Sequence, residues 1–136
     1  MLFTQKSEVD IHEMSPLALA FVGDAVLELL VRARLVGTTR LQPNRLHTVA
    51  THYVSAHAQN LELDIIGPML TDAEAAVLRR GKNASKATVA KHATVQEYRA
   101  STGFECLLGW LYLTGQMARV EELFDALWQQ FDPNQK

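Results

Sequence analysis

The feature that most constrains the fold of this chain is one long apolar segment, residues 17–31. Ser15 is well placed to cap a helix there, and Pro16 suits the first helical position. Gly37 suits a left-handed exit, so we predict a helix over residues 16–36. Because this helix is apolar nearly all round, we expect it to lie in the middle of the fold with other helices packed about it.

The rest of the chain also has the pattern of helices, because Pro, Gly and Ser/Thr residues bracket segments that are longer than most strands. Two helices are expected to open with a capping box, Thr71 with Glu74 and Thr94 with Glu97. The predicted elements after the first are helices over residues 43–60, 71–81, 94–113 and 117–131, a short turn or helix over 61–70, and a loop over 82–91. No segment has a convincing strand pattern. We therefore predict an all-α helical bundle in which residues 1–136 form one domain.

The chain has a single cysteine, Cys106, so it can form no internal disulfide and no multi-cysteine zinc site. This is typical of a protein from a reducing compartment. The N-terminal residues have neither a secretory signal pattern nor the Arg-rich pattern of an organelle-targeting segment. Residues 17–31 contain two acids and are shorter than the roughly 20 residues that cross a bilayer. We therefore expect a cytoplasmic protein without a membrane span.

The charges of this chain are unevenly distributed, although its formal net charge is only −2. Residues 75–104 contain six of the 13 Lys and Arg residues and a single acid, Glu97. The six basic residues are Arg79, Arg80, Lys82, Lys86, Lys91 and Arg99. A basic patch on an acidic body would suit a partner such as nucleic acid. The other interpretation is an ordinary solvated surface.

Gly23 and Asp24 lie at the centre of the apolar first helix, where both are poor helix formers. A buried carboxylate without a partner is costly, and Glu28 adds a like charge one turn later. A bound cation would offset both effects. Arg32, on the same face as Glu28, could satisfy the acids instead, and the spacing alone does not decide between these two interpretations.

Glu105 is a second acid in an apolar predicted helix, and Gly109 follows it by one turn. Gly23 and Gly109 would let the two helices approach closely. The Asp24 and Glu105 carboxylates could then converge on one hard divalent ion, with waters completing its octahedron, and Mg²⁺ is the natural candidate. Alternatively, Gly109 only permits tight packing and Glu105 pairs with a base such as Arg99.

Four segments carry a resemblance to a known family. They are LALAFVGDAVLELL at residues 17–30, RRGKNA at 79–84, VQEYRASTGFE at 95–105 and ECLLGWLYL at 105–113. The first resembles the signature helix of the ribonuclease III catalytic domain, and the last looks like that family's second acidic helix. The other two are similar to its short Mini-ribonuclease III subgroup, which has the catalytic domain without a double-stranded-RNA-binding domain. The resemblance covers about residues 17–124.

This resemblance implies an all-helical, homodimeric, metal-dependent endoribonuclease that cuts double-stranded RNA. By position, Asp24 matches the family's catalytic aspartate and Glu105 its partner glutamate, both implied metal ligands. The implied cofactor is Mg²⁺, with Mn²⁺ as an alternative ion, and it would activate a water that hydrolyses a phosphodiester. Three acids of the larger enzymes are replaced here by Leu17, Ala20 and Thr102, so fewer carboxylates remain to hold metal.

The subgroup resemblance further implies a substrate, the precursors of large-subunit (23S) ribosomal RNA. Double-stranded RNA is recognised mainly by its shape, phosphates and 2′-hydroxyls, which suits a basic loop without a base-reading motif. The candidate RNA contacts are Arg79, Arg80, Lys82, Asn83 and Lys86. Two other functions stay open at this point: a noncatalytic structural RNA-binding module of the ribonuclease III fold, and a helical protein-interaction domain.

Overall fold

Every regular element that the structure describes is a helix. The structure is a computed structural model, and it describes residues 7–86 and 93–136. The helices are η1 (Ile11–Glu13), α1 (Pro16–Thr38), α2 (Pro43–Val54), α3 (Ala56–Ile66), η2 (Gly67–Met69), α4 (Asp72–Ala84), α5 (Val95–Leu113) and α6 (Met117–Gln130). These two stretches contain no strand, so the predicted all-α fold is confirmed for them.

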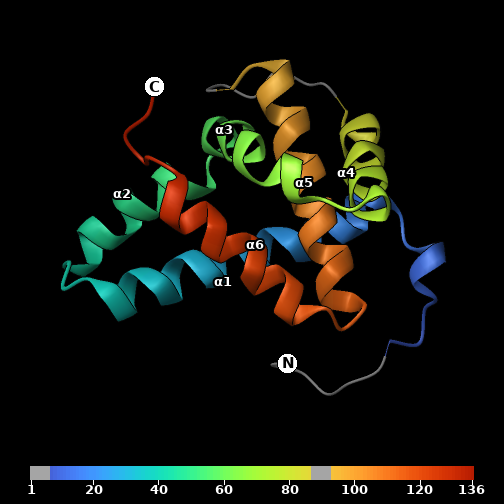
Figure 1. The fold of residues 1–136 in the computed structure, drawn as a ribbon, viewed down its shortest axis with the longest axis horizontal. Coiled ribbons are helices and arrows are strands. Elements are labelled where there is room, and N and C mark those ends of the chain that lie inside the picture. The colour runs from blue at the N-terminus through green and yellow to red at the C-terminus, as the bar shows by residue number, and fades with distance from the viewer. Residues whose placement is uncertain (1–6, 87–92) are drawn as a thin grey trace.

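Helix α5 forms the centre of the fold. It packs most extensively against α1, and α4 and α3 cover other sides of it. Figure 1 shows α5 between α3 and α4. Side chains of α1 and α5 fill the middle of the core and are almost completely buried, among them Leu27, Val31, Leu107, Leu108 and Leu111. The two most apolar helices therefore hold each other.

Helix α1 begins where the sequence predicts. The hydroxyl of Ser15 accepts a backbone N–H three residues on, and Pro16 occupies the first turn. The predicted exit at Gly37 is wrong, because the helix continues to Thr38. Among the described residues only Gly115, just after α5, has a positive φ, at 77°.

The predicted helix over residues 43–60 is in fact two helices that meet at Ser55. This residue is extended, with φ −63° and ψ 158°, and its hydroxyl accepts the N–H of Ala58, so that it caps α3. Helix α3 then continues to Ile66, through residues that we expected to form a turn. The apolar period runs on across the break, which is why periodicity did not reveal it.

Helix α4 does not stop at Gly81, as predicted, but continues to Ala84. Gly81 serves close packing instead. A Cβ atom there would lie 2.6 Å from the Cβ of Cys106 and 2.9 Å from the Cα of Gly103, both on α5. The glycine therefore lets α4 lie directly against α5.

Both predicted capping boxes are present. Thr71 and Glu74 exchange side-chain and backbone hydrogen bonds at the start of α4, and Thr94 and Glu97 do the same at the start of α5. The Glu97 carboxylate also meets Nδ1 of His57, at 2.5 Å, which ties the start of α5 to α3.

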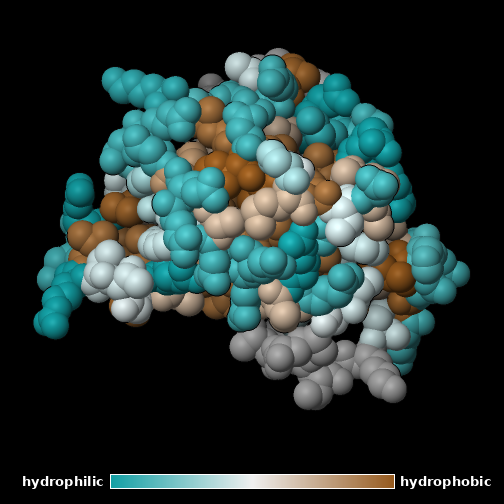
Figure 2. Space-filling view, viewed as in Figure 1, coloured by the Kyte–Doolittle hydropathy of each residue, from teal (hydrophilic) through white to brown (hydrophobic). Residues whose placement is uncertain are grey.

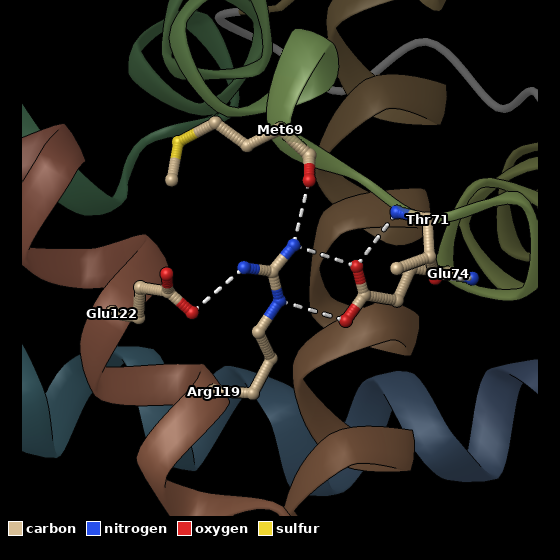
Figure 3. A network of polar contacts seen from close by, with 5 residues as sticks. All are labelled: Met69, Thr71, Glu74, Arg119 and Glu122. Carbon is tan, nitrogen blue, oxygen red and sulfur yellow. Dashed lines mark hydrogen bonds and ion pairs between the residues drawn. The ribbon is translucent and has the colours of Figure 1, made fainter.

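Arg119 of α6 uses the capping glutamate of α4 as its partner, as Figure 3 shows. Its Nε and Nη2 donate to the two carboxylate oxygens of Glu74, each at 2.9 Å. Nη2 also donates to the carbonyl of Met69, at 2.6 Å, and Nη1 to Glu122, at 2.8 Å. The hydrogen bonds from Arg119, with that from Thr71, hold the pKa of the Glu74 carboxyl below its usual value. This network joins α6 to η2 and to the start of α4.

One face of α1 remains uncovered, which corrects the expectation that other helices surround it. Four large apolar side chains of α1 are exposed: Leu17, Phe21, Leu29 and Val36. On the face of the molecule that Figure 2 draws, hydrophilic residues predominate and hydrophobic residues form separate patches. No helix within residues 7–86 and 93–136 combines the length and apolar character needed to cross a membrane.

Candidate active site

The backbones of α1 and α5 are in contact at two glycines. A Cβ atom on Gly23 would lie 1.6 Å from the carbonyl oxygen of Glu105 and 2.9 Å from the nitrogen of Gly109. A Cβ atom on Gly109 would lie 1.9 Å from the carbonyl oxygen of Leu19. Such distances are possible only without side chains, so the expected close approach of the two helices through Gly23 and Gly109 is confirmed.

This contact places the carboxyl group of Asp24 near that of Glu105, close enough for the one to act on the charge of the other. The pKa of Glu105 is raised to about 7, chiefly because burial disfavours its charged form. The nearby charges of Asp24 and Glu28 raise it further, while a hydrogen bond from Gln59 acts in the opposite direction. Asp24 disfavours the charged form of Glu105, and a cation between the two groups would stabilise that form.

The acids of α1 have different surroundings. Glu28 accepts a hydrogen bond from Nε of Arg32 at 3.0 Å, so the pairing with Arg32 that we kept open is correct for Glu28. It is not correct for Asp24, which has no ion pair within the described part of the chain. The exposed Asp24 carboxylate therefore remains available to a ligand.

The alternative partner of Glu105 is also wrong. Arg99 donates from Nε to the carbonyl of Lys82 at 3.0 Å and from Nη2 to Oδ1 of Asn83 at 3.1 Å. These bonds fasten the end of α4 to α5 and direct the guanidinium away from Glu105. The polar partner of Glu105 is instead Gln59 of α3, whose Nε2 donates to Glu105 Oε2 at 3.0 Å.

Sequence reasoning missed Gln59. It is 1% exposed and its Nε2 also donates to the carbonyl of Val54, at 2.9 Å. The sequence around it offers no signal, because a glutamine next to Asn60 in a mixed helix reads as an ordinary surface residue. Its burial depends on how α3 lies against α5, which no local pattern encodes.

The donor set of Asp24 and Glu105 fits a hard divalent cation. Carboxylate oxygens are the ligands of Mg²⁺, which commonly uses one or two of them and takes the rest from water and substrate phosphates. Across residues 7–86 and 93–136, no three His, Cys, Asp or Glu side chains gather as a ready-made metal site. Asp24 and Glu105 could therefore hold such an ion only together with water or phosphate oxygens.

The candidate RNA contacts gather around the C-terminal end of α4. Arg79, Arg80, Lys82 and Asn83 lie on its last two turns and Lys86 follows them, so Lys82 and Asn83 belong to the helix rather than to the predicted loop. All except Lys82 are exposed. The stem of Lys82 lies over Gly103, which keeps this residue half-buried. Lys91, the remaining basic residue of the predicted loop, lies outside the described residues.

Helix α5 lies between the two acids and the basic cluster, by which we mean Arg79, Arg80, Lys82 and Lys86 at the end of α4. Its residues Gly103 and Cys106 face α4, whereas Glu105 faces α1 and α3. Cys106 is buried and its thiol pKa is raised to about 11 by that burial, so it is a packing residue. The acids and the basic end of α4 thus lie on different sides of the same short stretch of one helix.

Comparisons with known proteins agree on one family. Residues 17–116 match the family described as "Ribonuclease III domain". The chain is similar to Mini-ribonuclease 3 of Enterococcus faecalis, with 48% identity over 118 residues that cover 85% of this chain and 89% of the relative. It is also similar to Mini-ribonuclease 3 of Symbiobacterium thermophilum, with 46% identity over 113 residues, 83% of this chain and 87% of the relative.

A solved structure extends this similarity to three dimensions. A crystal structure of a protein from Fusobacterium nucleatum superposes on this chain with a TM-score of 0.79 at 29% sequence identity. The match covers 87% of this chain and 96% of that one. The helical arrangement around α5 is therefore shared with an experimentally determined fold.

Proposed function

Because this chain belongs to the ribonuclease III family, with Mini-ribonuclease 3 proteins among its relatives, we propose that it is a metal-dependent endoribonuclease that hydrolyses double-stranded RNA. One observation carries the proposal: two acids on apolar helices meet where glycines bring the backbones into contact. A protein that only binds RNA has no use for such a pair, because two neighbouring carboxylates repel each other and the phosphates.

Asp24 and Glu105 are the proposed catalytic residues and the proposed ligands of Mg²⁺, or of Mn²⁺ in its place. When bound, such an ion supplies an activated water and stabilises the charge that develops on the phosphate. The exposed Asp24 can reach an ion at the surface, while Glu105 is largely buried. The burial of Glu105 also limits the screening of its charge by bulk water.

The RNA contacts that we propose are Arg79, Arg80, Lys82, Asn83 and Lys86. Positive charges that bind phosphates release counterions, which gives sequence-independent affinity for a duplex. Arg99 is fastened to α4 and so serves to shape this surface. The substrate that we propose is a precursor of large-subunit (23S) ribosomal RNA, by analogy with the subgroup, and the proposed compartment is the cytoplasm.

We also propose that the protein acts as a homodimer through the uncovered face of α1. Phe21 is 83% exposed there, which is unusual for a phenylalanine in a soluble helix. A hollow of about 400 Å³ beside it is lined by Phe21, Asp24, Leu29 and Tyr112, among others. A second copy would cover this apolar surface, and it would do so directly beside Asp24.

Cleavage of a long double-stranded RNA tests this function. With Mg²⁺ the purified protein should cut the duplex, and EDTA or Asp24→Asn should abolish cutting. Asp24→Asn should still bind the duplex, because it removes a negative charge without touching the basic cluster. The double variant Lys82→Ala/Lys86→Ala should instead weaken binding. The slope of the logarithm of the binding constant against the logarithm of the salt concentration should become shallower, by about 2 at most.

The same experiment contains the outcome that overturns the proposal. If the protein binds the duplex but cuts it with neither Mg²⁺ nor Mn²⁺, it is a noncatalytic RNA-binding protein of this fold. If the Lys82→Ala/Lys86→Ala variant keeps the salt dependence of the wild type, the end of α4 is an ordinary solvated surface and does not contact RNA.

A further inference from the structure

Within the described part of the chain, Gln59 is the one buried side chain that hydrogen-bonds to the proposed catalytic pair. It lies on α3, outside the two helices that carry Asp24 and Glu105. Both hydrogens of its amide are used: one goes to Glu105 Oε2 at 3.0 Å, the other to the Val54 carbonyl at 2.9 Å. The Val54 carbonyl can only accept, and the charged Glu105 carboxylate also accepts, so together they fix which end of the amide faces Glu105.

The break between α2 and α3 provides one of these acceptors. Val54 is the last residue of α2, and the extended conformation of Ser55 ends the helix there. Its carbonyl is thus one of the acceptors that a helix end leaves without an intrahelical partner. Gln59 satisfies it and is thereby held in place. A local feature of the backbone is in this way connected to the orientation of Glu105.

The position of Gln59 has a cost. Its Oε1 is buried and has no hydrogen-bond partner among the described residues. A buried acceptor without a partner costs about 1–3 kcal/mol. A leucine or methionine would fill a buried site on α3 without that cost, so packing alone does not account for a glutamine here. The hydrogen bond that the Gln59 amide donates to Glu105 does account for it.

We propose that Gln59 is a positioning residue for Glu105: by holding Oε2 it fixes the rotation of the carboxylate and leaves Oε1 for a cation shared with Asp24. The inference rests on the proposed function, because it concerns the proposed metal ligand. Residues that hydrogen-bond to ligands orient them, and their loss typically weakens metal affinity or activity by about 10–100-fold. Gln59 itself touches neither metal nor RNA in this role.

Metal binding without RNA is the first test, because it does not depend on activity. Mn²⁺ is titrated into the RNA-free protein and free Mn²⁺ is followed by electron paramagnetic resonance. Gln59→Met keeps the length of the side chain but removes the donor, and its Mn²⁺ affinity should fall by about 10–100-fold. The Mg²⁺ concentration for half-maximal cleavage should rise in parallel, while cleavage at saturating Mg²⁺ partly recovers.

A matched variant separates positioning from general destabilisation. Val120→Ala opens a cavity in the buried face of α6, a helix that carries neither proposed metal ligand, so it should lower the melting temperature without changing Mn²⁺ affinity. If Gln59→Met does not fold, Gln59→Asn takes its place, since its shorter amide cannot reach both acceptors. Duplex binding by each variant should equal that of the wild type.

The possible results are distinct. Unchanged Mn²⁺ affinity in a folded Gln59 variant, or an equal loss in Val120→Ala, overturns the positioning role and leaves the nuclease function intact. If the wild type itself binds no Mn²⁺ and cuts no duplex, the proposed function fails and the inference fails with it. A loss confined to the Gln59 variants supports the inference.

Discussion

Gly23 lacks the atom that would keep α1 and α5 apart. Intrinsic preference favours alanine over glycine inside a helix by about 1 kcal/mol, so a surface glycine in this position would be a defect. Here any Cβ atom would overlap the Glu105 carbonyl oxygen. Glycine at position 23 costs the helix some stability, but it allows the close contact with α5 that places the next residue, Asp24, beside Glu105.

Gly23→Ala should therefore destabilise the protein, against the direction of helix propensity. The obstacle is backbone, which cannot move aside as a flexible side chain does, so the helices must separate. We expect the free energy of unfolding in urea to fall by about 3 kcal/mol or more, at the upper end of overpacking effects. Cleavage should be lost with it, because Asp24 and Glu105 would no longer meet.

Gly37→Ala is the control for this prediction. Gly37 lies on the same helix, and a Cβ atom there would meet nothing within 4 Å. This variant should be as stable as the wild type or more stable, by up to about 1 kcal/mol. A Gly23→Ala protein that is equally stable and still cuts RNA would contradict the contact between α1 and α5.

At the scale of elements, Arg119 connects helices that are far apart in the sequence. It joins α6 to the start of α4 through Glu74, which is buried. Arg119→Met should lower the free energy of unfolding at pH 7 by about 2–3 kcal/mol, because Glu74 would stay charged in a buried place without its partner. Urea denaturation measures this difference.

The effect of Arg119→Met should also depend on pH. Arg119 holds the pKa of Glu74 below the ordinary value of about 4.3. Their interaction therefore stabilises the folded protein fully above that value, and the contribution is lost as the pH falls through the lower pKa of the folded state. The difference in stability between wild type and variant should shrink below about pH 4.

A second substitution is the control for the ion pair. Glu74→Gln combined with Arg119→Met removes the isolated charge and keeps an acceptor for the N–H of Thr71. It should recover at least half of the lost stability. If Arg119→Met alone is as stable as the wild type at pH 7, the network in Figure 3 does not hold α6 in place.

The elements that the sequence predicts best are those whose signals are local. A capping box needs only Thr71 and Glu74, three residues apart, and both boxes are present. The sequence does not reveal the break at Ser55, because residue type alone does not distinguish a serine that caps a helix from a serine inside one. It predicts a helix end at Gly81, because the actual contact of this glycine with α5 depends on a distant part of the chain.

The candidate site divides in the same way. Asp24 and Glu105 could be named from the sequence because an acid in an apolar helix is conspicuous, and two glycines marked where the helices would meet. Gln59 could not, since its significance comes from a third helix. The catalytic and metal-binding roles of the acids stay predictions, which the cleavage and Mn²⁺ experiments test.

At the scale of the whole molecule, three surfaces are placed around the pair α1 and α5. The acids lie where the two helices touch, the basic end of α4 lies on another side of α5, and the uncovered apolar face belongs to α1. The formal net charge of −2 averages over these differences. An RNA duplex would be attracted to one end of the molecule, and a second copy of the chain to the face of α1.

The uncovered face of α1 predicts an oligomeric state. In solution the wild type should sediment at twice the chain mass of 15.2 kDa. Phe21→Glu should sediment as a monomer at the same concentration, because a charge placed in an apolar interface loses its hydration without gaining a partner. We expect dimerisation to weaken by about 100-fold or more, which corresponds to roughly 2.7 kcal/mol. Analytical ultracentrifugation over a range of concentrations gives the dissociation constant.

Val95→Glu is the matched control, since Val95 is also an exposed apolar residue, 40% exposed, but lies at the start of α5. An acid in the first turn of a helix is favourable, so this variant should fold and remain a dimer. A wild-type monomer, or a Phe21→Glu dimer as tight as the wild type, would exclude this face of α1 as the interface. Because Asp24 lines the hollow beside Phe21, a dimer formed here would also change access to the acids, so cleavage by Phe21→Glu should fall together with its dimer fraction.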